Sequence, residues 1–197
     1  MSSDVGVTLS NGCRITHGRG ANIKKPFSDI DLTMHELSPG NQKGFRGQLG
    51  FIEFTPELRL PRHVHMDASK ERLLDERILV LHGVGVVEIA GKVWATAPGT
   101  LVDITGGIPH TWSACPAGVK LSDGSVSEGK FTMVFEYEEP TSFFPTRSTE
   151  TVTNVAQYQP FDGDNFDEIR FPKLTAQQVA EQAEIVFDKQ QQRLSLP

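Results

Sequence analysis

Two histidines one residue apart, in the stretch RHVHMDASKERLLDERILVLHG (residues 62–83), are the clearest candidates for chemistry in this sequence. His63 and His65 lie in strand-like sequence, and alternate side chains of a strand point to the same side, so the two imidazoles should converge on one point. On a helix the same spacing would turn them about 200° apart, which is why helical zinc motifs place their histidines four residues apart. The pair therefore predicts a metal site built on a strand.

Four carboxylates follow the histidine pair, at Asp67, Glu71, Asp75 and Glu76. Glu76 heads the apolar run 78–81, so it is expected to face the interior, where a charge is costly unless it is paired or bound to a metal. Asp67, Glu71 and Asp75 fall where the strand should turn or in the connection that follows. We predict Glu76 as the third ligand, with these three as alternatives.

A fourth ligand is expected from the stretch PGTLVDITGGIPHTW (residues 98–112), which has the pattern of a strand, a Gly-Gly turn and the start of a new strand. His110 is the histidine that enters this new strand. His17 and His35 belong to the N-terminal part and are expected at the surface or at an interface. His82 is next to a turn glycine, and its even spacing from the glutamate keeps it as an alternative ligand.

Short strand-like runs separated by turn residues fill residues 47–140, a texture typical of an antiparallel sandwich or barrel. Only residues 67–76 suggest a helical period within this range. The runs are residues 48–55, 59–66, 76–83, 85–91, 93–98, 100–105, 110–114 and 131–139.

The barrel segment is flanked by an N-terminal arm, residues 1–46, that is rich in Gly, Ser, Asn and Pro. Apolar residues alternate over Ile30–Met34, as in a half-buried strand. The exposed edges of a small barrel, together with such an arm, predict a homodimer in which this strand pairs with the sheet edge of a partner.

The C-terminal segment, residues 141–197, begins irregularly and is expected to wrap around the barrel or a second subunit. Thr175 and Gln178 then form a capping box, and apolar residues continue at helical spacing as far as Phe187. This pattern predicts a C-terminal α-helix that packs on its own barrel, with a contact between subunits as the alternative.

The composition favours a soluble, cytoplasmic protein with a small-molecule partner. A net charge of −6, a pI near 5.5 and no basic cluster longer than Lys24–Lys25 argue against nucleic acid and anionic membranes. The sequence has neither a signal-peptide pattern nor an apolar run long enough to span a membrane. Two cysteines, Cys13 and Cys115, are too few for a disulfide framework.

The ligand pattern resembles that of the cupins, a family of small jelly-roll barrels. Their first motif is G-x5-H-x-H-x3,4-E-x6-G and their second is G-x5-P-x-G-x2-H-x3-N. The matching residues are His63, His65, Glu76 and Gly83 in the first motif, and Gly99, Gly107 and His110 in the second.

The sequence also departs from these motifs. Glu57 stands in place of the opening glycine, Thr105 in place of the proline and Ala114 in place of the final asparagine. Ten residues, rather than three or four, separate His65 from Glu76. This longer spacer implies an insertion next to the metal that could act as a rim or lid.

The resemblance implies an all-β, cupin-type jelly-roll barrel over about residues 47–138, with the N-terminal extended arm and the C-terminal α-helix added to it. It implies a divalent metal ion, Fe(II) favoured, with Mn, Ni or Zn also suited to imidazole and carboxylate ligands. The activity it implies first is a non-haem iron dioxygenase for a small aromatic or dicarbonyl compound. A non-redox metal-dependent isomerase, lyase or decarboxylase, and a non-catalytic small-molecule-binding barrel, are the alternatives.

Four further residues are candidates for the substrate pocket. Arg59 would share the face of the histidine pair in a continuous strand, where it could bind a carboxylate or form a salt bridge at the rim. Trp112 shares the face of His110, where it could stack on an aromatic substrate or pack in the core. Phe135 and Tyr137 alternate with polar residues and are expected to face an apolar cavity.

Overall fold

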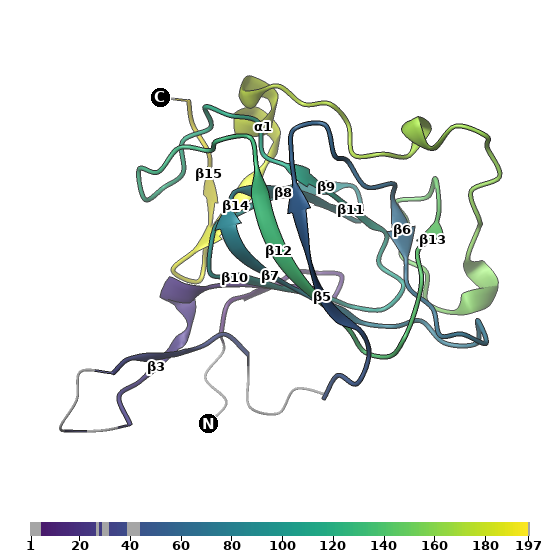
Figure 1. Ribbon diagram of the computed structural model, residues 1–197, viewed down its shortest axis with the longest axis horizontal. Coiled ribbons are helices and arrows are strands. Elements are labelled where there is room, and N and C mark those ends of the chain that lie inside the picture. Colours follow the sequence, from purple (N-terminus) through teal and green to yellow (C-terminus); the bar gives the residue numbers. More distant parts are fainter. Residues whose placement is uncertain (1–4, 27, 29–31, 39–43, 197) are drawn as a thin grey trace.

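The computed structural model describes residues 5–26, 28, 32–38 and 44–196, and this part of the chain is built mainly of β-strands in two large sheets (Figure 1). The six-stranded sheet has the order β1-β2-β10-β7-β12-β5, and the seven-stranded sheet has the order β13-β6-β11-β8-β9-β14-β15. The strands of the first sheet are β1 (Val7–Thr8), β2 (Arg14–His17), β5 (Leu49–Phe54), β7 (Glu76–Gly83), β10 (Thr100–Ile104) and β12 (Phe131–Tyr137). Those of the second are β6 (His63–Val64), β8 (Gly85–Ile89), β9 (Lys92–Thr96), β11 (His110–Ala114), β13 (Phe144–Pro145), β14 (Glu184–Phe187) and β15 (Gln190–Arg193). A separate hairpin pairs β3 (Asn22–Lys24) with β4 (Met34–Glu36).

The two sheets enclose one apolar core between their inner faces. Ile78, Val102 and Met133 from the six-stranded sheet pack in the same buried cluster as Val87 and Trp112 from the seven-stranded sheet. Such burial is the main favourable term in folding, and the core residues that supply it recur at every second position along strands such as β7 and β12. The expected all-β barrel is confirmed.

Most strand boundaries agree with the sequence pattern, but the run 59–66 is broken. Only His63–Val64 forms a regular strand, β6, while Arg59, Pro61 and Met66 make isolated bridges. A proline has no N–H to donate to a ladder, so Pro61 interrupts the pairing just before the histidines. The loop 67–75 is a series of turns and not a helix, with Lys70 at a φ of +57°.

The C-terminal helix is shorter than expected. The capping box at Thr175 is present, but α1 spans only Ala176–Gln182, and Glu184–Phe187 continues as strand β14. The reason is the two-residue period of the segment: Val186 packs in the core between the sheets, whereas Ile185 and Phe187 pack in a second cluster outside it. This strand pairs in parallel with β9, and α1 packs on its own barrel through the buried Val179.

The described part of the N-terminal segment belongs largely to the barrel. Strand β2 pairs with β10, which places Cys13 and Ile15 in the core. His17 was expected at the surface or an interface, but it is buried, with its ring 4.3 Å from that of Phe187. Of the predicted strand Ile30–Met34, residues 30 and 31 lie outside the described residues, and β4 begins only at Met34.

Three short 3-10 helices complete the secondary structure of the described chain: Gly18–Gly20, Val155–Gln157 and Phe166–Glu168. None of its helices has the length and apolar character needed to cross a lipid bilayer.

Candidate metal centre

Strand pairing brings the histidines together. His63 on β6 is the direct cross-strand partner of His110 at the start of β11, and His65 follows on the same side two residues later. Glu76 is the first residue of β7 in the opposite sheet. All four side chains are buried within the barrel, with exposures of at most 4%.

Each histidine has its Nδ1 atom next to a backbone carbonyl. Nδ1 lies 2.7 Å from the Pro61 oxygen in His63, 3.0 Å from the Ser142 oxygen in His65 and 2.9 Å from the Ile108 oxygen in His110. A carbonyl only accepts, so these contacts fix the tautomer with the proton on Nδ1 and leave a lone pair on Nε2. This is the outer arrangement typical of histidines that bind a metal.

The free lone pairs face one another. The ligand atoms of the three histidines all lie within 4.8 Å of one another. Oε2 of Glu76 lies 2.9 Å from Nε2 of His110 and 3.6 Å from Nε2 of His65, yet none of these three buried atoms makes a hydrogen bond. Buried polar atoms are rarely left unpaired, and acceptor atoms that face one another repel unless a cation lies between them. The donor set fits a divalent metal ion, which three imidazoles and one carboxylate would hold.

The pKa values of the site agree with this arrangement. Burial, reinforced by His110 and His65, lowers the pKa of His63 well below its usual range, so its imidazole stays neutral. Burial alone would raise the pKa of Glu76, but positive charge on the adjacent His65 and His110 outweighs burial and lowers that pKa below its usual value, and a cation between these groups would act in the same direction. Both groups are therefore held in the protonation state that a metal ligand needs.

The three alternative carboxylates lie elsewhere. Asp67 closes the following loop, where its Oδ1 accepts hydrogen bonds from the backbone N–H groups of Glu71 and Arg72 at 2.8 and 2.9 Å. Asp75 accepts from the N–H of Gly106 at 2.7 Å, and Glu71 is exposed. His82, the alternative histidine ligand, is also exposed. Glu76 is thus the carboxylate that the structure brings to the histidines.

Two of the predicted pocket residues line a cavity of about 480 Å³ beside this cluster. The ring of Tyr137 lies 4.5 Å from that of His65, and Phe135 is 5.1 Å from Tyr137. The wall contains no acidic or basic side chain; its residues are Gln48, Leu49, Ile52, Phe135, Tyr137, Thr141, Ser142 and Phe143.

The sequence analysis did not identify the segment 141–145 as part of the site. Its strand β13 pairs with β6, which carries His63, and the ring of Phe143 lies 4.5 Å from the His63 ring. The neighbouring Ser142 supplies the carbonyl that orients His65. The only signal was the pair of aromatic residues in FFP (143–145), within a polar stretch that has no period.

Two predicted pocket residues lie apart from the cavity. Arg59 does not share the face of the histidines, because the strand is interrupted; its guanidinium donates to the Phe171 carbonyl at 2.7 Å and lies 3.5 Å from Asp167. Trp112 is 1% exposed and stacks on Phe131 in the core. For Arg59, this position agrees with the salt bridge rather than with binding of a substrate carboxylate. For Trp112, it agrees with packing in the core rather than with stacking on a substrate.

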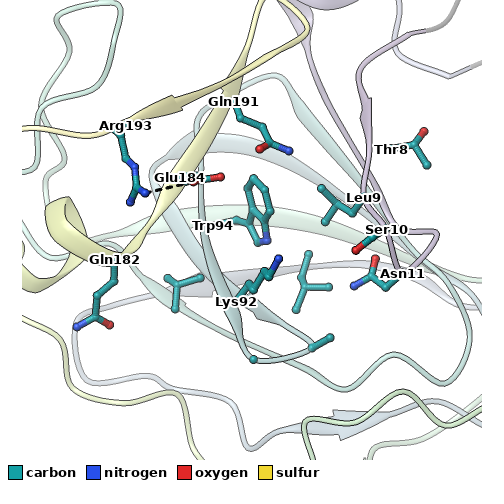
Figure 2. A pocket seen from close by; sticks show the side chains of 14 residues that line it. Thr8, Leu9, Ser10, Asn11, Lys92, Trp94, Gln182, Glu184, Gln191 and Arg193 are labelled. Carbon is teal, nitrogen blue, oxygen red and sulfur yellow. Dashed lines mark ion pairs between the residues drawn. The ribbon is translucent and has the colours of Figure 1, made fainter.

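A larger cavity, of about 620 Å³, lies away from the histidines (Figure 2). It is bordered by the β1–β2 turn, the β8–β9 hairpin and the β14–β15 hairpin, with the Trp94 side chain near its centre. Its charged residues are Lys92, Glu184 and Arg193, the last two 3.6 Å apart. It contains none of the four candidate ligands.

Comparison with known proteins gives similarity in structure only. No protein-family model matches the chain, and no curated protein matches it in sequence. Similar solved structures include a dTDP-4-dehydrorhamnose 3,5-epimerase from Elizabethkingia anophelis NUHP1, with 12% identity, a TM-score of 0.44 and coverage of 70% of this chain and 74% of the other. A dTDP sugar isomerase from Desulfovibrio desulfuricans G20 shows 11% identity and a TM-score of 0.42, over 76% and 94% of the two chains.

A cupin 2 domain-containing protein from Halorhodospira halophila is also similar, with 10% identity and a TM-score of 0.39, over 66% of this chain and 77% of the other. These likenesses are loose, and the reaction is therefore argued from the site itself. The all-β barrel with three histidines turned inward agrees with the cupin resemblance of the sequence.

Proposed function

We propose that the protein is a metal-dependent enzyme that acts on a small, uncharged, largely apolar molecule. The observation that carries this proposal is the buried set of His63, His65, His110 and Glu76, which lies beside an apolar cavity. Nε2 of His65, Nε2 of His110 and Oε2 of Glu76 are buried there without a hydrogen-bond partner. Imidazole and carboxylate ligands suit Fe(II), Mn(II), Ni(II) and Zn(II), so the ligand types fit the group without selecting among these metals.

The cavity wall supports an uncharged substrate. Aromatic and aliphatic side chains there would pack on an apolar ring or chain, while Gln48, Thr141 and Ser142 provide a few polar groups that could fix its orientation. A phosphate or carboxylate group placed against this wall, away from the ion, would have no cationic side chain to pair with, which is costly in a buried site. Aromatic and dicarbonyl compounds fit these conditions.

The reaction we propose is dioxygenation. An iron ion held by these ligands would supply the oxygen chemistry, and the surrounding residues would bind and orient the substrate and exclude water. Tyr137 is the one side chain of the cavity wall with a titratable proton, and burial raises its pKa. It therefore keeps its proton and can donate a hydrogen bond, but it is not suited to act as a general base.

A non-redox isomerase, lyase or decarboxylase is the second candidate. The position of the Tyr137 ring against His65 favours it, because a phenol that keeps its proton beside the site could donate a hydrogen bond to the oxygen of a substrate that the metal polarises. This candidate requires the ion to act as a Lewis acid, with no consumption of oxygen.

Oxygen uptake separates the two candidates. The protein loaded with Fe(II) should consume oxygen in the presence of a substrate from a panel of aromatic and dicarbonyl compounds. Mass spectrometry should show that the product contains oxygen atoms taken from O₂. Turnover of the same compound without oxygen would instead establish the non-redox reaction. Binding without any product would leave a ligand-binding barrel. Tyr137→Phe, which keeps the ring and removes the hydroxyl, should reduce turnover most strongly if the reaction needs the hydrogen bond that this hydroxyl donates.

Phe143 is expected to control access to the ion. Phe143→Ala removes a ring of the cavity wall that lies 4.5 Å from the His63 ring, so a chelator should withdraw the metal at least about 10-fold faster. The rate can be followed by the absorbance of a coloured chelator. Phe166→Ala is the matched control, since Phe166 is 45% exposed against 42% for Phe143 but contacts Phe161 rather than the histidines. Equal rates for the two variants would contradict the role of Phe143.

A further inference from the structure

The loop 67–75 fills the long spacer between His65 and Glu76, and we call it the spacer loop. Its last turn folds back on the histidine segment, where the N–H of Leu74 donates to the carbonyl of His65 at 3.0 Å. At its start, Asp67 accepts the backbone N–H groups that close the loop. The spacer loop is therefore a compact structure that runs directly into candidate ligands at both ends.

Arg72 joins the spacer loop to the segment 138–144. One end of its guanidinium, Nη1, lies 2.6 Å from Oε1 of Glu138, and the other end, Nη2, lies 2.6 Å from Oε1 of Glu139. Glu138 is 5% exposed, and its second oxygen accepts the N–H of Asp75 at 3.3 Å. An exposed ion pair would contribute little, but a buried carboxylate that loses its cation is left uncompensated. Arg72 therefore fixes the start of this segment against the spacer loop.

Further contacts hold the same segment on both sides of Ser142. The hydroxyl of Thr141 donates to the carbonyl of Met66 at 2.5 Å, and the Lys70 amino group lies 5.8 Å from the centre of the Phe144 ring. An ammonium group at this distance is attracted to the face of an aromatic ring. Both partners lie in or next to the spacer loop, so these contacts fix the position of the Ser142 carbonyl.

His65 differs from the other two histidines in how its orientation is set. The carbonyls next to His63 and His110 belong to residues only two positions earlier in the chain. The carbonyl next to His65 belongs to Ser142, which lies 77 residues later in the sequence. Local chain geometry can therefore orient two of the imidazoles, whereas the third depends on how the segment 138–144 packs.

We propose that Arg72 is a positioning residue for the candidate metal centre. By holding the segment 138–144, it keeps the Ser142 carbonyl on Nδ1 of His65, so that the proton stays on Nδ1 and the lone pair of Nε2 faces the other ligands. The spacer loop then supports a ligand, a role that differs from the rim or lid that its length suggested. The effect of Arg72 on metal binding rests on the proposed function, whereas its effect on the His65 ring does not.

Hydrogen exchange at the imidazole rings, followed by nuclear magnetic resonance in the chelator-dialysed protein, tests the proposal. A buried Nδ1–H that donates to a carbonyl exchanges with water only when the contact opens, so its exchange rate reports that opening. In Arg72→Met, which removes the charge and keeps a long side chain, the His65 Nδ1–H should exchange at least about 10-fold faster than in the wild type. The corresponding protons of His63 and His110 should be unchanged. An unchanged rate at His65, or an equal rise at all three rings, would overturn the proposal.

Arg147→Met is the matched control. The Arg147 side chain is 49% exposed against 42% for Arg72, and it too pairs with two carboxylates, Glu168 at 2.6 Å and Asp162 at 3.9 Å, which lie in another segment. Its replacement should leave exchange at His65 unchanged, and Arg72→Lys, which keeps the charge, should restore part of the slow exchange. If Arg147→Met raised the rate as much as Arg72→Met, general loosening of the surface would explain the effect and the proposal would fail.

Metal affinity separates this proposal from the proposed function. Titration with Zn(II) should show an affinity about 10-fold lower in Arg72→Met than in the wild type, at the lower end of the range for residues that orient a metal ligand. Equal affinities would overturn the role of Arg72 in metal binding. A wild-type protein that binds no metal would overturn the proposed function and with it this role, while faster exchange at His65 alone would still establish that Arg72 positions the ring.

Discussion

His63→Ala should reduce the affinity of the protein for a divalent metal ion. The reduction should exceed about 10- to 100-fold, which is typical when a residue that only orients a metal ligand is removed. The alanine removes one of three imidazoles whose lone pairs face the same point, and the remaining ligands keep their positions because other carbonyls hold them. Glu76→Gln should have a similar effect, since the amide keeps the shape of the side chain but removes its negative charge. Elemental analysis after dialysis against a weak chelator measures the loss.

His82→Ala is the matched control for these variants. His82 lies on β7, the strand that carries Glu76, but it is exposed and outside the cluster. Its replacement should leave the metal content unchanged. Full retention of metal in His63→Ala would rule out the site, whereas retention in Glu76→Gln alone would leave a three-histidine centre without the carboxylate.

Trp112→Ala should lower the free energy of unfolding by about 3–5 kcal/mol, as large-to-small changes of buried aromatic residues do. Trp112 is 1% exposed, and its ring stacks on Phe131 with centroids 6.0 Å apart, so the alanine leaves a void in the middle of the core. Denaturant unfolding followed by circular dichroism measures the change. The metal bound per folded molecule should stay the same, because Trp112 packs in the core and does not line the cavity beside the histidines.

Trp112→Phe separates packing from hydrogen bonding at this position. The indole Nε1 of Trp112 is buried without a hydrogen-bond partner, so the smaller ring gives up no polar contact. Its cost should be well below that of the alanine. If Trp112→Phe lost turnover while its stability and metal content were unchanged, Trp112 would instead have to contact the substrate.

The barrel and the ligand cluster were accessible from sequence because both depend on a period of two. Alternation in a strand places His63 and His65 on one side and predicts which residues of β7 and β12 face the core. Glu76 followed from the cost of burying a charge beside apolar neighbours. These inferences use only the alternation of side chains within one strand, and this alternation does not depend on which other segments the strand contacts.

The remaining features depend on contacts between distant segments. The approach of Phe143 to His63 results from pairing of two-residue strands, which no periodic pattern marks in the sequence. The end of α1 at Gln182 was also missed, because Val186 and Phe187 fit a helical stripe as well as a strand until the partner surfaces are known. Arg59 was misplaced for a local reason, the interruption at Pro61, which the assumption of a continuous strand had ignored.

The carbonyl of Ser142 connects two events that would otherwise be independent. It orients His65, and its neighbour Phe143 lines the cavity, so in the proposed metal enzyme a movement of this segment that admits a molecule would also disturb the His65 ligand. The two equilibria are then thermodynamically coupled, and the coupling must be reciprocal. In the proposed enzyme, a compound that holds the segment closed would raise the affinity for the metal, and the metal would raise the affinity for that compound by the same factor.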